Sequence, residues 1–207
     1  MSTISPRTSR ELHIIGERRG IRLLDVAISG STPAVEQGTL TLLVGGDGDL
    51  FHAAEPIFQA VAKRHFLLGD AGSGTAMKLV VNTLLGVGMQ AIAEAVVLGE
   101  RIGLNRERLL EVLSQTAVVA PAHLGKLASA MVNDYRPQFP LRLMNKDLGL
   151  ILDEAARGHI RMPATEAAFY VNSGELARGE EEDFSAVLRR MEEVAGHQAI
   201  PSEPVTK

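Results

Sequence analysis

The sequence predicts a mixed fold in which an α/β part comes first and an all-helical part follows. In roughly the first seventy residues, short apolar runs alternate with segments of helical spacing, and after Gly74 the strand patterns disappear. Aromatic residues make up only 4% of the 207 residues and Trp is absent, so the core is built from aliphatic side chains and Met. This composition favours helices and parallel strands over an aromatic-rich β-sandwich, and the length allows one or two domains.

Helices and strands are expected to alternate in the first part. Ser5 followed by Pro6 is typical of a helix start, and Gly20 is expected to end that helix. The strands are expected at 21–28, 39–44 and 65–68. A helix begins at Asp49 between the last two strands, and Pro56 is expected to kink it or to mark its true first turn. Because a parallel layer needs several strands covered on both faces, this set looks like the back half of a larger sheet.

The second part is expected to hold only helices, and its first helix is the longest. That helix runs from about Thr75 to Ile102, and Asn105 caps the next one. Further helices are expected at 122–132, 145–156, 164–177 and 184–194. The longest apolar stretch, 77–99, contains polar and acidic side chains that a membrane helix would hold at considerable cost. We therefore predict a helix buried in protein and no membrane partner.

Composition and charge exclude several classes of protein. Basic residues number 21 and acidic residues 25, a balance that argues against a nucleic-acid partner. Cys is absent, which excludes disulfides, thiolate metal sites and Cys nucleophiles and fits a cytoplasmic location. The six His residues form no pair at the close spacing of metal ligands, so no metal is expected. The N-terminal segment has no apolar signal-peptide core.

The first candidate site follows the strand at 21–28. Ser29 and Gly30 stand at the carboxyl end of that strand, where α/β folds bind ligands. Ser29 offers a hydroxyl, and Gly30 lets a backbone N–H approach a carboxylate closely. The alternative is an ordinary turn, because Ser and Gly are common turn residues, and taken alone this alternative is favoured.

The second candidate site is the glycine-rich segment 69–74 with the helix that follows it. Such a turn at a helix start could hold an anion. Lys78 and Asn82 lie four residues apart in this helix and therefore share a face amid apolar residues. A lysine in apolar surroundings can have a lowered pKa and act as an acid or base. The alternative is a lysine whose stem lies on apolar surface and whose charge reaches water.

The third candidate site is the segment 139–153, in which Lys146 and Asp147 precede an apolar run. Here the alternative is a charged helix start, which is sufficient by itself to explain both residues. The acidic run 180–183 is expected to be a solvated loop.

Together and in this order, these motifs resemble those of the β-hydroxyacid dehydrogenases, the 3-hydroxyisobutyrate dehydrogenase family. The segment DVAISGSTPAVEQGTL at 25–40 is similar to the family's substrate motif, and the segment at 2–6 to its S-T-x-x-P motif. Two further family motifs match Gly72, Gly74, Lys78 and Asn82, and then Phe139, Leu143, Lys146, Asp147 and Leu148. The resemblance covers residues 2–195, nearly the whole chain.

The resemblance implies a partial Rossmann sheet at 1–73, an all-α 6-phosphogluconate dehydrogenase-like domain at 74–196 and a tail at 197–207. It implies an oxidoreductase that uses NAD or NADP to interconvert a short 3-hydroxy acid and its semialdehyde. It also implies a homodimer or higher oligomer, which the apolar faces of the long helix favour independently.

The resemblance assigns a role to each candidate residue. Lys78 is the acid or base at the substrate oxygen, and Asn82 orients it and holds substrate. The substrate carboxylate is bound by Ser29 and Gly30. The residues expected at the nicotinamide end of the cofactor are Thr3, Phe139, Lys146 and Asp147.

The sequence also departs from the family in ways that leave alternatives open. Ala27, Ser31 and Ala34 replace the family's Pro, Gly and Gly in the substrate motif. The family's GxGxxG turn, which binds the cofactor pyrophosphate, is absent from these residues, so the chain by itself is expected to be inactive. The alternatives are a truncated, non-catalytic dimerising fragment and an imine reductase-like enzyme. Lys78 disfavours the imine reductase, because those enzymes usually lack this lysine.

Overall fold

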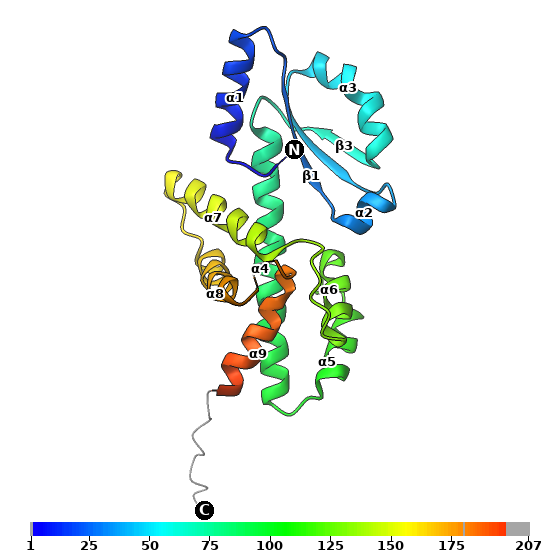
Figure 1. Ribbon diagram of the computed structural model, residues 1–207, viewed down its shortest axis with the longest axis vertical. Helices are drawn as coiled ribbons and strands as arrows, with labels where there is room; N and C mark the ends of the chain where they lie inside the picture. The colour runs from blue at the N-terminus through cyan, green and yellow to red at the C-terminus, as the bar shows by residue number, and fades with distance from the viewer. Residues whose placement is uncertain (1, 180, 198–207) are drawn as a thin grey trace, which may run out of the picture.

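The computed structural model describes residues 2–179 and 181–197. Figure 1 shows a small sheet with its helices at one end and a helical part at the other, joined by one long helix. The strands are β1 (Leu24–Ser29), β2 (Thr41–Gly46) and β3 (Arg64–Leu67). The helices are α1 (Pro6–Arg18), α2 (Thr32–Glu36), α3 (Gly48–Val61), α4 (Ser73–Arg101), α5 (Arg106–Ser114), α6 (Pro121–Met131), α7 (Leu141–Arg157), α8 (Pro163–Gly179) and α9 (Val187–His197), with a 3₁₀ turn η1 (Phe184–Ala186).

The sheet has the order β1-β2-β3 and mixes both strand directions. β1 pairs with β2 antiparallel, with Asp25 opposite Gly45, whereas β2 pairs with β3 parallel, with Thr41 opposite Arg64. The sequence led us to expect parallel strands throughout, and the β1–β2 pair corrects this. The reason is the length of the connections. Only the short helix α2 separates β1 from β2, whereas α3 gives β2 and β3 the long crossover that parallel strands need.

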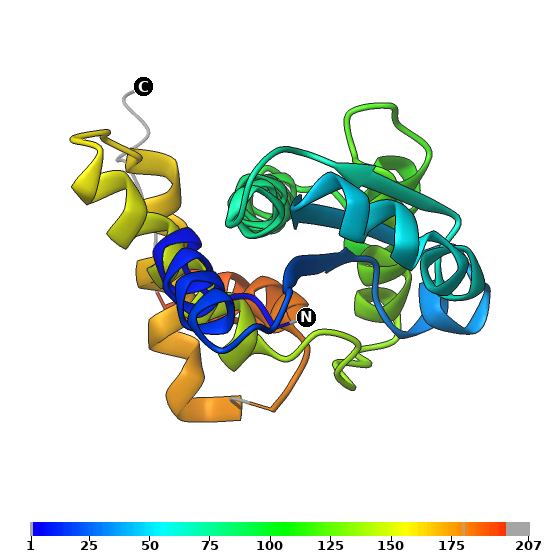
Figure 2. The same ribbon diagram turned by 90° about the horizontal axis from the view of Figure 1, so that it is seen from above.

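The sheet is covered by α3 and by the first turns of α4. β2 is the central strand, and Leu42 and Val44 of this strand are fully buried against Phe51 and Phe58 of α3. The start of α4 lies against β1 and β2, and α3 packs on β2 and β3 (Figure 2). This arrangement places Asp25, in the amino-terminal half of β1, beside the first turn of α4.

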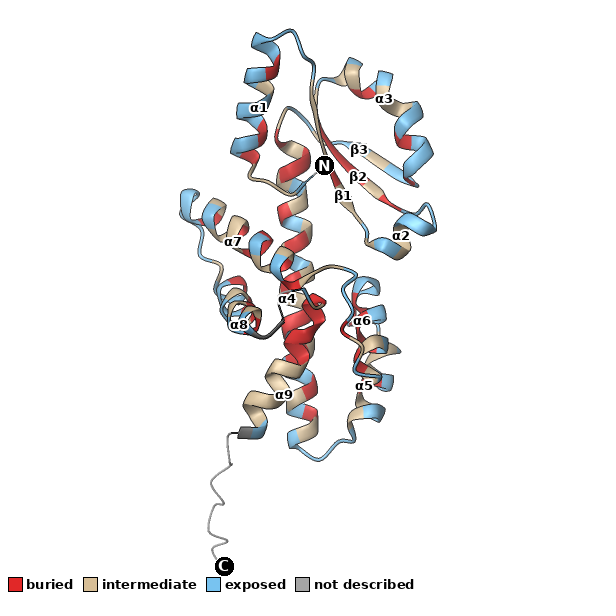
Figure 3. Ribbon diagram, viewed as in Figure 1, coloured by how far each residue is buried: buried red, intermediate tan, exposed pale blue. Residues whose placement is uncertain are grey.

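Helix α4 forms the core of the helical part as well. Beyond the sheet it packs against α7, α8 and α9, and its middle section is buried (Figure 3). By length and composition α4 could cross a membrane, but 39% of its most apolar window is buried inside the protein, and core helices pass the same test. The absence of a membrane partner therefore stays a prediction.

Most expected elements are present, with ends displaced by a few residues. Ser5 and Asn105 each accept a hydrogen bond from the third residue beyond them, which confirms both as helix caps. Asp47 rather than Asp49 caps α3, and Pro56 lies inside that helix. Helix α2 was not expected, and the helix predicted from 184 begins as η1. The division at residues 73 and 74 remains a prediction, and 198–207 of the predicted tail lie outside the described residues.

Candidate active site

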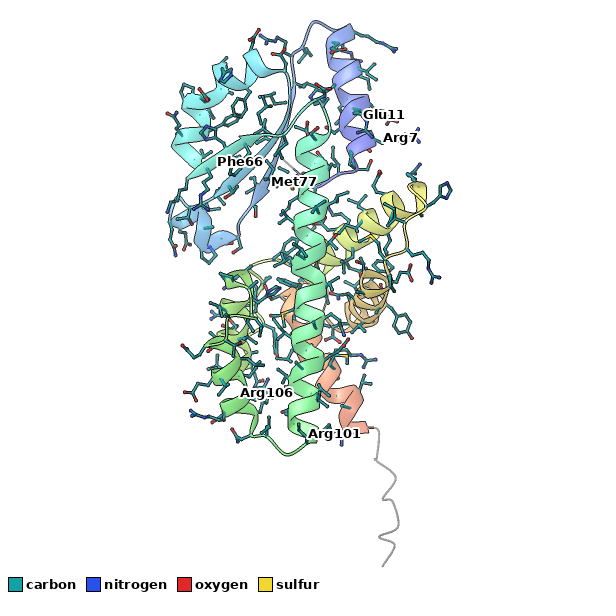
Figure 4. The ribbon with its side chains drawn as sticks, turned by 180° about the vertical axis from the view of Figure 1, so that it is seen from behind. Arg7, Glu11, Phe66, Met77, Arg101 and Arg106 are labelled. Atoms are coloured by element: carbon teal, nitrogen blue, oxygen red, sulfur yellow. The ribbon has the colours of Figure 1, made fainter. Side chains whose placement is uncertain are left out.

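Lys78 lies in the second turn of α4, where this helix leaves the sheet. Figure 4 labels its neighbour Met77 at this level. The Lys78 side chain is half-buried and hydrogen-bonds to none of the residues that the structure describes. Burial lowers the pKa of its ammonium group below the ordinary lysine value, and the nearby charge of Lys146 acts in the same direction, while Asp147 opposes both. An amine with these properties is suited to proton transfer near neutral pH.

Asn82, one turn further along α4, is fully buried against α7. Its Nδ2 donates to Oδ2 of Asp147 across 2.5 Å, and Asp147 is also buried. Oδ1 of Asn82 is buried and has no partner among the described residues. A buried amide oxygen without a partner is costly, so Asn82 offers an open acceptor on the helix face that it shares with Lys78.

Lys146 extends this cluster to the start of the chain. Its Nζ lies 2.7 Å from Oδ1 of Asp147 and donates to the backbone oxygen of Thr3 across 2.7 Å. Thr3 precedes α1 in the α/β part, whereas Lys146 and Asp147 belong to α7. The structure therefore brings Thr3, Asn82, Lys146 and Asp147 into one connected group, with Lys78 within electrostatic range of both members of the α7 pair.

Ser29 and Gly30 end β1 and lead into α2, as the sequence predicts. Gly30 has φ of 132°, a conformation that favours glycine, and a Cβ there would lie 2.7 Å from a methyl of Leu40. Among the described residues, neither Ser29 nor Gly30 hydrogen-bonds to Lys78 or Asn82. The structure forms the tight turn but does not join it directly to the lysine cluster.

Phe139 is held by a different group of residues. Its backbone N–H donates to Oδ2 of Asp183 across 3.1 Å, and its ring meets that of Phe184 edge-on with the centroids 5.8 Å apart. No hydrogen bond joins Phe139 to Lys146 or Asp147 within the part of the chain that the structure describes. Its predicted place beside the nicotinamide therefore stays a prediction.

The glycine-rich turn before α4 holds an anion that belongs to the chain itself. Oδ1 of Asp25 accepts the N–H of Gly72 at 2.9 Å, and Oδ2 accepts the N–H and the hydroxyl of Thr75 at 2.8 and 3.0 Å. These donors are therefore not open to a cofactor phosphate. This role of Asp25 was not predicted, although a lone carboxylate within the apolar run IRLLDVAI indicates one, because a partly buried charge needs partners.

Asp183, the last residue of the acidic run, differs from the solvated loop that we expected, whereas Glu180 lies outside the described residues. Asp183 is buried and lies 2.7 Å from Nζ of the buried Lys126. Asp183 also accepts the backbone N–H groups of Gln138 and Phe139 and both donors of Ser185. Its short side chain ties the segment before α7 to η1, so this part of the acidic run has a structural role.

His123 has an ordinary structural partner. Nε2 of His123 lies 2.9 Å from the backbone oxygen of Leu85, and the ring fills the space that Gly88 leaves on α4, since a Cβ there would lie 2.7 Å from it. Within residues 2–179 and 181–197, no group of three or more His, Asp and Glu could hold a metal ion.

The cluster around Lys146 fits one end of a nicotinamide cofactor better than the other. The open oxygen of Asn82 and the cations Lys78 and Lys146 offer polar contacts where a nicotinamide ring and a small oxygenated substrate would meet. The donors of the glycine-rich turn, in contrast, are taken by Asp25. The described residues thus fit the reacting end of the cofactor.

Two family models match the chain. The model described as the NAD-binding domain of NADP-dependent 3-hydroxyisobutyrate dehydrogenase matches residues 72–191, and that of the NAD-binding domain of 6-phosphogluconate dehydrogenase matches residues 1–69.

Curated relatives and solved structures agree with these models. The 2-(hydroxymethyl)glutarate dehydrogenase of Eubacterium barkeri is 34% identical over 95% of this chain and 66% of its own length. Glyoxylate/succinic semialdehyde reductase 1 of Arabidopsis thaliana is 36% identical over 91% of this chain and 65% of its own. The structure of Mycobacterium tuberculosis 3-hydroxyisobutyrate dehydrogenase with L-serine is 34% identical, with a TM-score of 0.81 over 91% of this chain and 67% of that one. The chain therefore spans about two thirds of the length of these relatives.

Proposed function

Because this chain belongs to the 3-hydroxyisobutyrate dehydrogenase family, we propose that it supplies the acid–base lysine and the substrate turn of an NAD(P)-dependent dehydrogenase of short 3-hydroxy acids. The observation that carries this proposal is the cluster in which Lys78 stands one turn before Asn82 and within range of Asp147. Proton transfer at a substrate oxygen requires a positioned acid or base, and the half-buried amine beside the partnerless amide oxygen can serve as one.

Lys78 moves the proton in this proposal. Its lowered pKa leaves a larger fraction of the amine unprotonated near neutral pH than in an ordinary lysine. The amine takes the proton of the substrate hydroxyl when the alcohol is oxidised, and the ammonium returns it when the carbonyl is reduced. A nicotinamide cofactor, when bound, accepts or supplies the hydride. Thr3 and Lys146 are the residues that would hold its nicotinamide end.

Asn82 and Asp147 hold this arrangement in place. Because Nδ2 of Asn82 is held by Asp147, its partnerless Oδ1 is left to accept from the Lys78 ammonium or from the substrate hydroxyl. The negative charge of Asp147 also opposes the lowering of the Lys78 pKa by burial.

Ser29 and Gly30 bind the substrate carboxylate in this proposal. A serine hydroxyl and a glycine N–H can both donate to one carboxylate, and the positive φ of Gly30 opens the backbone for a close approach. The relatives named for glyoxylate and succinic semialdehyde, and the one solved with L-serine, point to small carboxylates as the class to screen.

We further propose that the chain works as a homodimer or higher oligomer through the outward face of α4. Val80, Leu84 and Leu98 lie on this face and are exposed. Large apolar side chains exposed on one face of a helix are typical of a protein interface.

A chimaera tests the proposed chemistry. In it, the 207 residues replace the matching 67% of the Mycobacterium tuberculosis 3-hydroxyisobutyrate dehydrogenase chain. We expect turnover of L-serine or 3-hydroxyisobutyrate with NAD or NADP. Lys78→Ala should lower kcat by about 10²–10⁴, the usual contribution of a positioned acid or base.

The matched control is Lys63→Ala, which removes an exposed lysine of the same chain and should leave kcat unchanged. A loss of less than about threefold on Lys78→Ala would exclude Lys78 as the acid or base. A folded chimaera without turnover of any short hydroxy acid would contradict the proposed function as a whole.

A further inference from the structure

Asp25 is the charged residue that connects the strand of the substrate turn to the helix of the catalytic lysine. It stands on β1, and its carboxylate accepts three hydrogen bonds from the turn that begins α4. Helix starts carry unsatisfied N–H groups that a carboxylate caps well. Here the cap comes from a strand, because Asp25 precedes Thr75 by 50 residues in the chain. The bond therefore joins two elements rather than closing one.

The two halves of the candidate site stand on the two elements that these hydrogen bonds join. Ser29 follows Asp25 by four residues on β1, which corresponds to about 13 Å along an extended strand. Lys78 follows Thr75 by three residues on α4, which corresponds to roughly 4.5 Å along the helix axis. Because strand and helix are stiff over these lengths, a shift of α4 against β1 at Thr75 changes the spacing of Lys78 and Ser29 by a similar amount.

The other contacts at this junction do not fix the helix in the same way. Gly74 lets the first turn of α4 lie flat on the sheet, since a Cβ there would lie 2.4 Å from the backbone oxygen of Leu43. This contact sets how close the helix comes but has no direction along the helix axis. Met77 and Val80 on the following turns are exposed. Within the part of the chain that the structure describes, the side-chain hydrogen bonds at the first turn of α4 are those that Asp25 accepts, and they restrain this turn in a defined direction.

We propose that Asp25 is a positioning residue for the reaction: its carboxylate fixes the axial and rotational position of α4 on β1, and with it the placement of Lys78 and Asn82 relative to the substrate turn. The inference rests on the proposed function only in taking Lys78 as the acid or base. The mechanical coupling itself concerns Asp25, Gly72 and Thr75 and is measured without turnover.

The first measurement is the spacing of the two elements in the 207-residue chain. The sequence has no Cys, so spin labels can be attached at Val35→Cys on α2 and Ala91→Cys on α4, both exposed positions. Labelled chain is diluted into unlabelled chain so that distances between protomers do not contribute. Asp25→Ala should shift or broaden the distance distribution, and Thr75→Val, which loses only the hydroxyl contact, should change it less.

The second measurement is the pKa of Lys78, taken from the pH dependence of its acylation by mass spectrometry. A displaced α4 should move this pKa toward the ordinary lysine value. The unprotonated fraction near neutral pH should then fall by about threefold or more, the effect of half a pKa unit. Lys63, exposed in the same samples, serves as the internal reference.

The matched control is Asp47→Ala. Asp47 caps α3 by accepting the N–H of Leu50 at 2.8 Å and lies in the same α/β part. Its loss should lower the thermal unfolding midpoint, because helix caps contribute to stability, and should leave both measurements unchanged.

The outcomes separate the two proposals. If Asp25→Ala alters neither the spacing nor the Lys78 pKa, or alters the spacing alone, then Asp25 is only a cap and the inference is overturned. Should Asp25→Ala fail to fold, Thr75→Val decides on the same criteria, because it keeps both backbone hydrogen bonds to Asp25. An inactive chimaera with altered spacing and pKa on Asp25→Ala would count against the proposed function alone.

Discussion

The amide of Asn82 and the carboxylate of Asp147 meet across 2.5 Å in the interior of the helical part, although 65 residues separate them in the chain. This hydrogen bond attaches α4 to α7 one helical turn beyond Lys78, where α4 has left the sheet. It also leaves Asn82 Oδ1 without a partner among the described residues. A fully buried polar pair with one open atom is costly for stability alone, which is why we assign it to the site.

Removing Asp147 should destabilise the fold. Asp147→Ala leaves the buried amide of Asn82 without its acceptor and Lys146 without its counter-ion, and losses of this kind cost about 2 kcal/mol or more. The free energy of unfolding in urea measures the effect. Asp153→Ala, on the exposed side of the same helix, is the control and should change stability by less than about 0.5 kcal/mol. If the two variants lower the free energy of unfolding equally, the Asn82–Asp147 contact does not contribute to stability.

Lys78 should reduce the stability of the protein at neutral pH. Its pKa in the folded state is lowered by burial from the ordinary value of 10.5. Between the folded and the ordinary pKa, the unfolded chain binds more protons, so stability rises with pH through this window. Lys78→Met removes the buried charge and should raise the stability most near neutral pH, by about 1 kcal/mol. The gain should shrink as pH approaches 10.5.

Thermal unfolding of both proteins across this pH range measures the difference. Lys63→Met is the control, because Lys63 is exposed and its loss should give no pH-dependent gain. A constant difference between Lys78→Met and the parent at all pH values would contradict a lowered pKa.

The sequence could predict the elements of this fold because their signals are local. Helical spacing of apolar residues and the caps Ser5 and Asn105 need only a few neighbouring residues. The shared face of Lys78 and Asn82 is likewise a consequence of helix geometry. The pairing of Asn82 with Asp147, in contrast, was not predicted, since no spacing within the chain indicates which helices touch.

The features that the sequence could not predict depend on distant partners. The antiparallel direction of β1 against β2 followed from a connection too short for a crossover, and we had assumed parallel strands. Asp is mostly found at protein surfaces. Asp25 and Asp183 nevertheless each accept hydrogen bonds from backbone N–H groups of another segment. Contacts between distant segments determine where these carboxylates lie, and the propensities of neighbouring residues contain no information about such contacts.

The ion pair of Lys126 with Asp183 should matter far more than an exposed pair. Lys126→Met leaves the buried Asp183 without its cation, and breaking a buried pair in this way costs about 3–5 kcal/mol. Arg136→Met is the control, because Arg136 pairs with Asp134 at the surface and exposed pairs contribute little to stability. Urea unfolding compares the two, and a similar small loss in both would contradict the structural role of Asp183.

The outward face of α4 should hold protomers together. Leu84 and Leu98 are 72% and 62% exposed on this face. Glutamate at both positions places charges in the proposed interface and should convert an oligomer to a monomer in light scattering, since charges are depleted from interface cores. Val118→Glu changes a more exposed residue away from α4 and should leave the mass unchanged. A monomeric parent protein at micromolar concentration would remove the proposal.

The 207-residue polypeptide by itself should bind NAD or NADP only weakly, with no measurable affinity below the millimolar range, and should not turn over hydroxy acids. Pyrophosphate binding in this class of fold relies on a glycine-rich turn whose N–H groups point at the ligand. The sequence contains no GxGxxG. In the turn before α4, the N–H groups of Gly72 and Thr75 already donate to Asp25. Only contacts near the nicotinamide are left, from Thr3 and Lys146, and these cannot replace the binding energy of the remote part of the cofactor.

Calorimetric titration with each cofactor measures this affinity, and a circular-dichroism spectrum with the helix content of the structure shows that the polypeptide is folded. The chimaera with the Mycobacterium tuberculosis chain is the positive control, because the match covers only 67% of that relative's chain and the chimaera keeps the unmatched part. It should bind one of the two cofactors at least about tenfold more tightly, a gain of roughly 1.4 kcal/mol. Micromolar binding by the 207-residue polypeptide would show that Thr3, Lys146 and their neighbours suffice, and the role assigned to Asp25 in closing the glycine-rich turn to phosphate would be wrong.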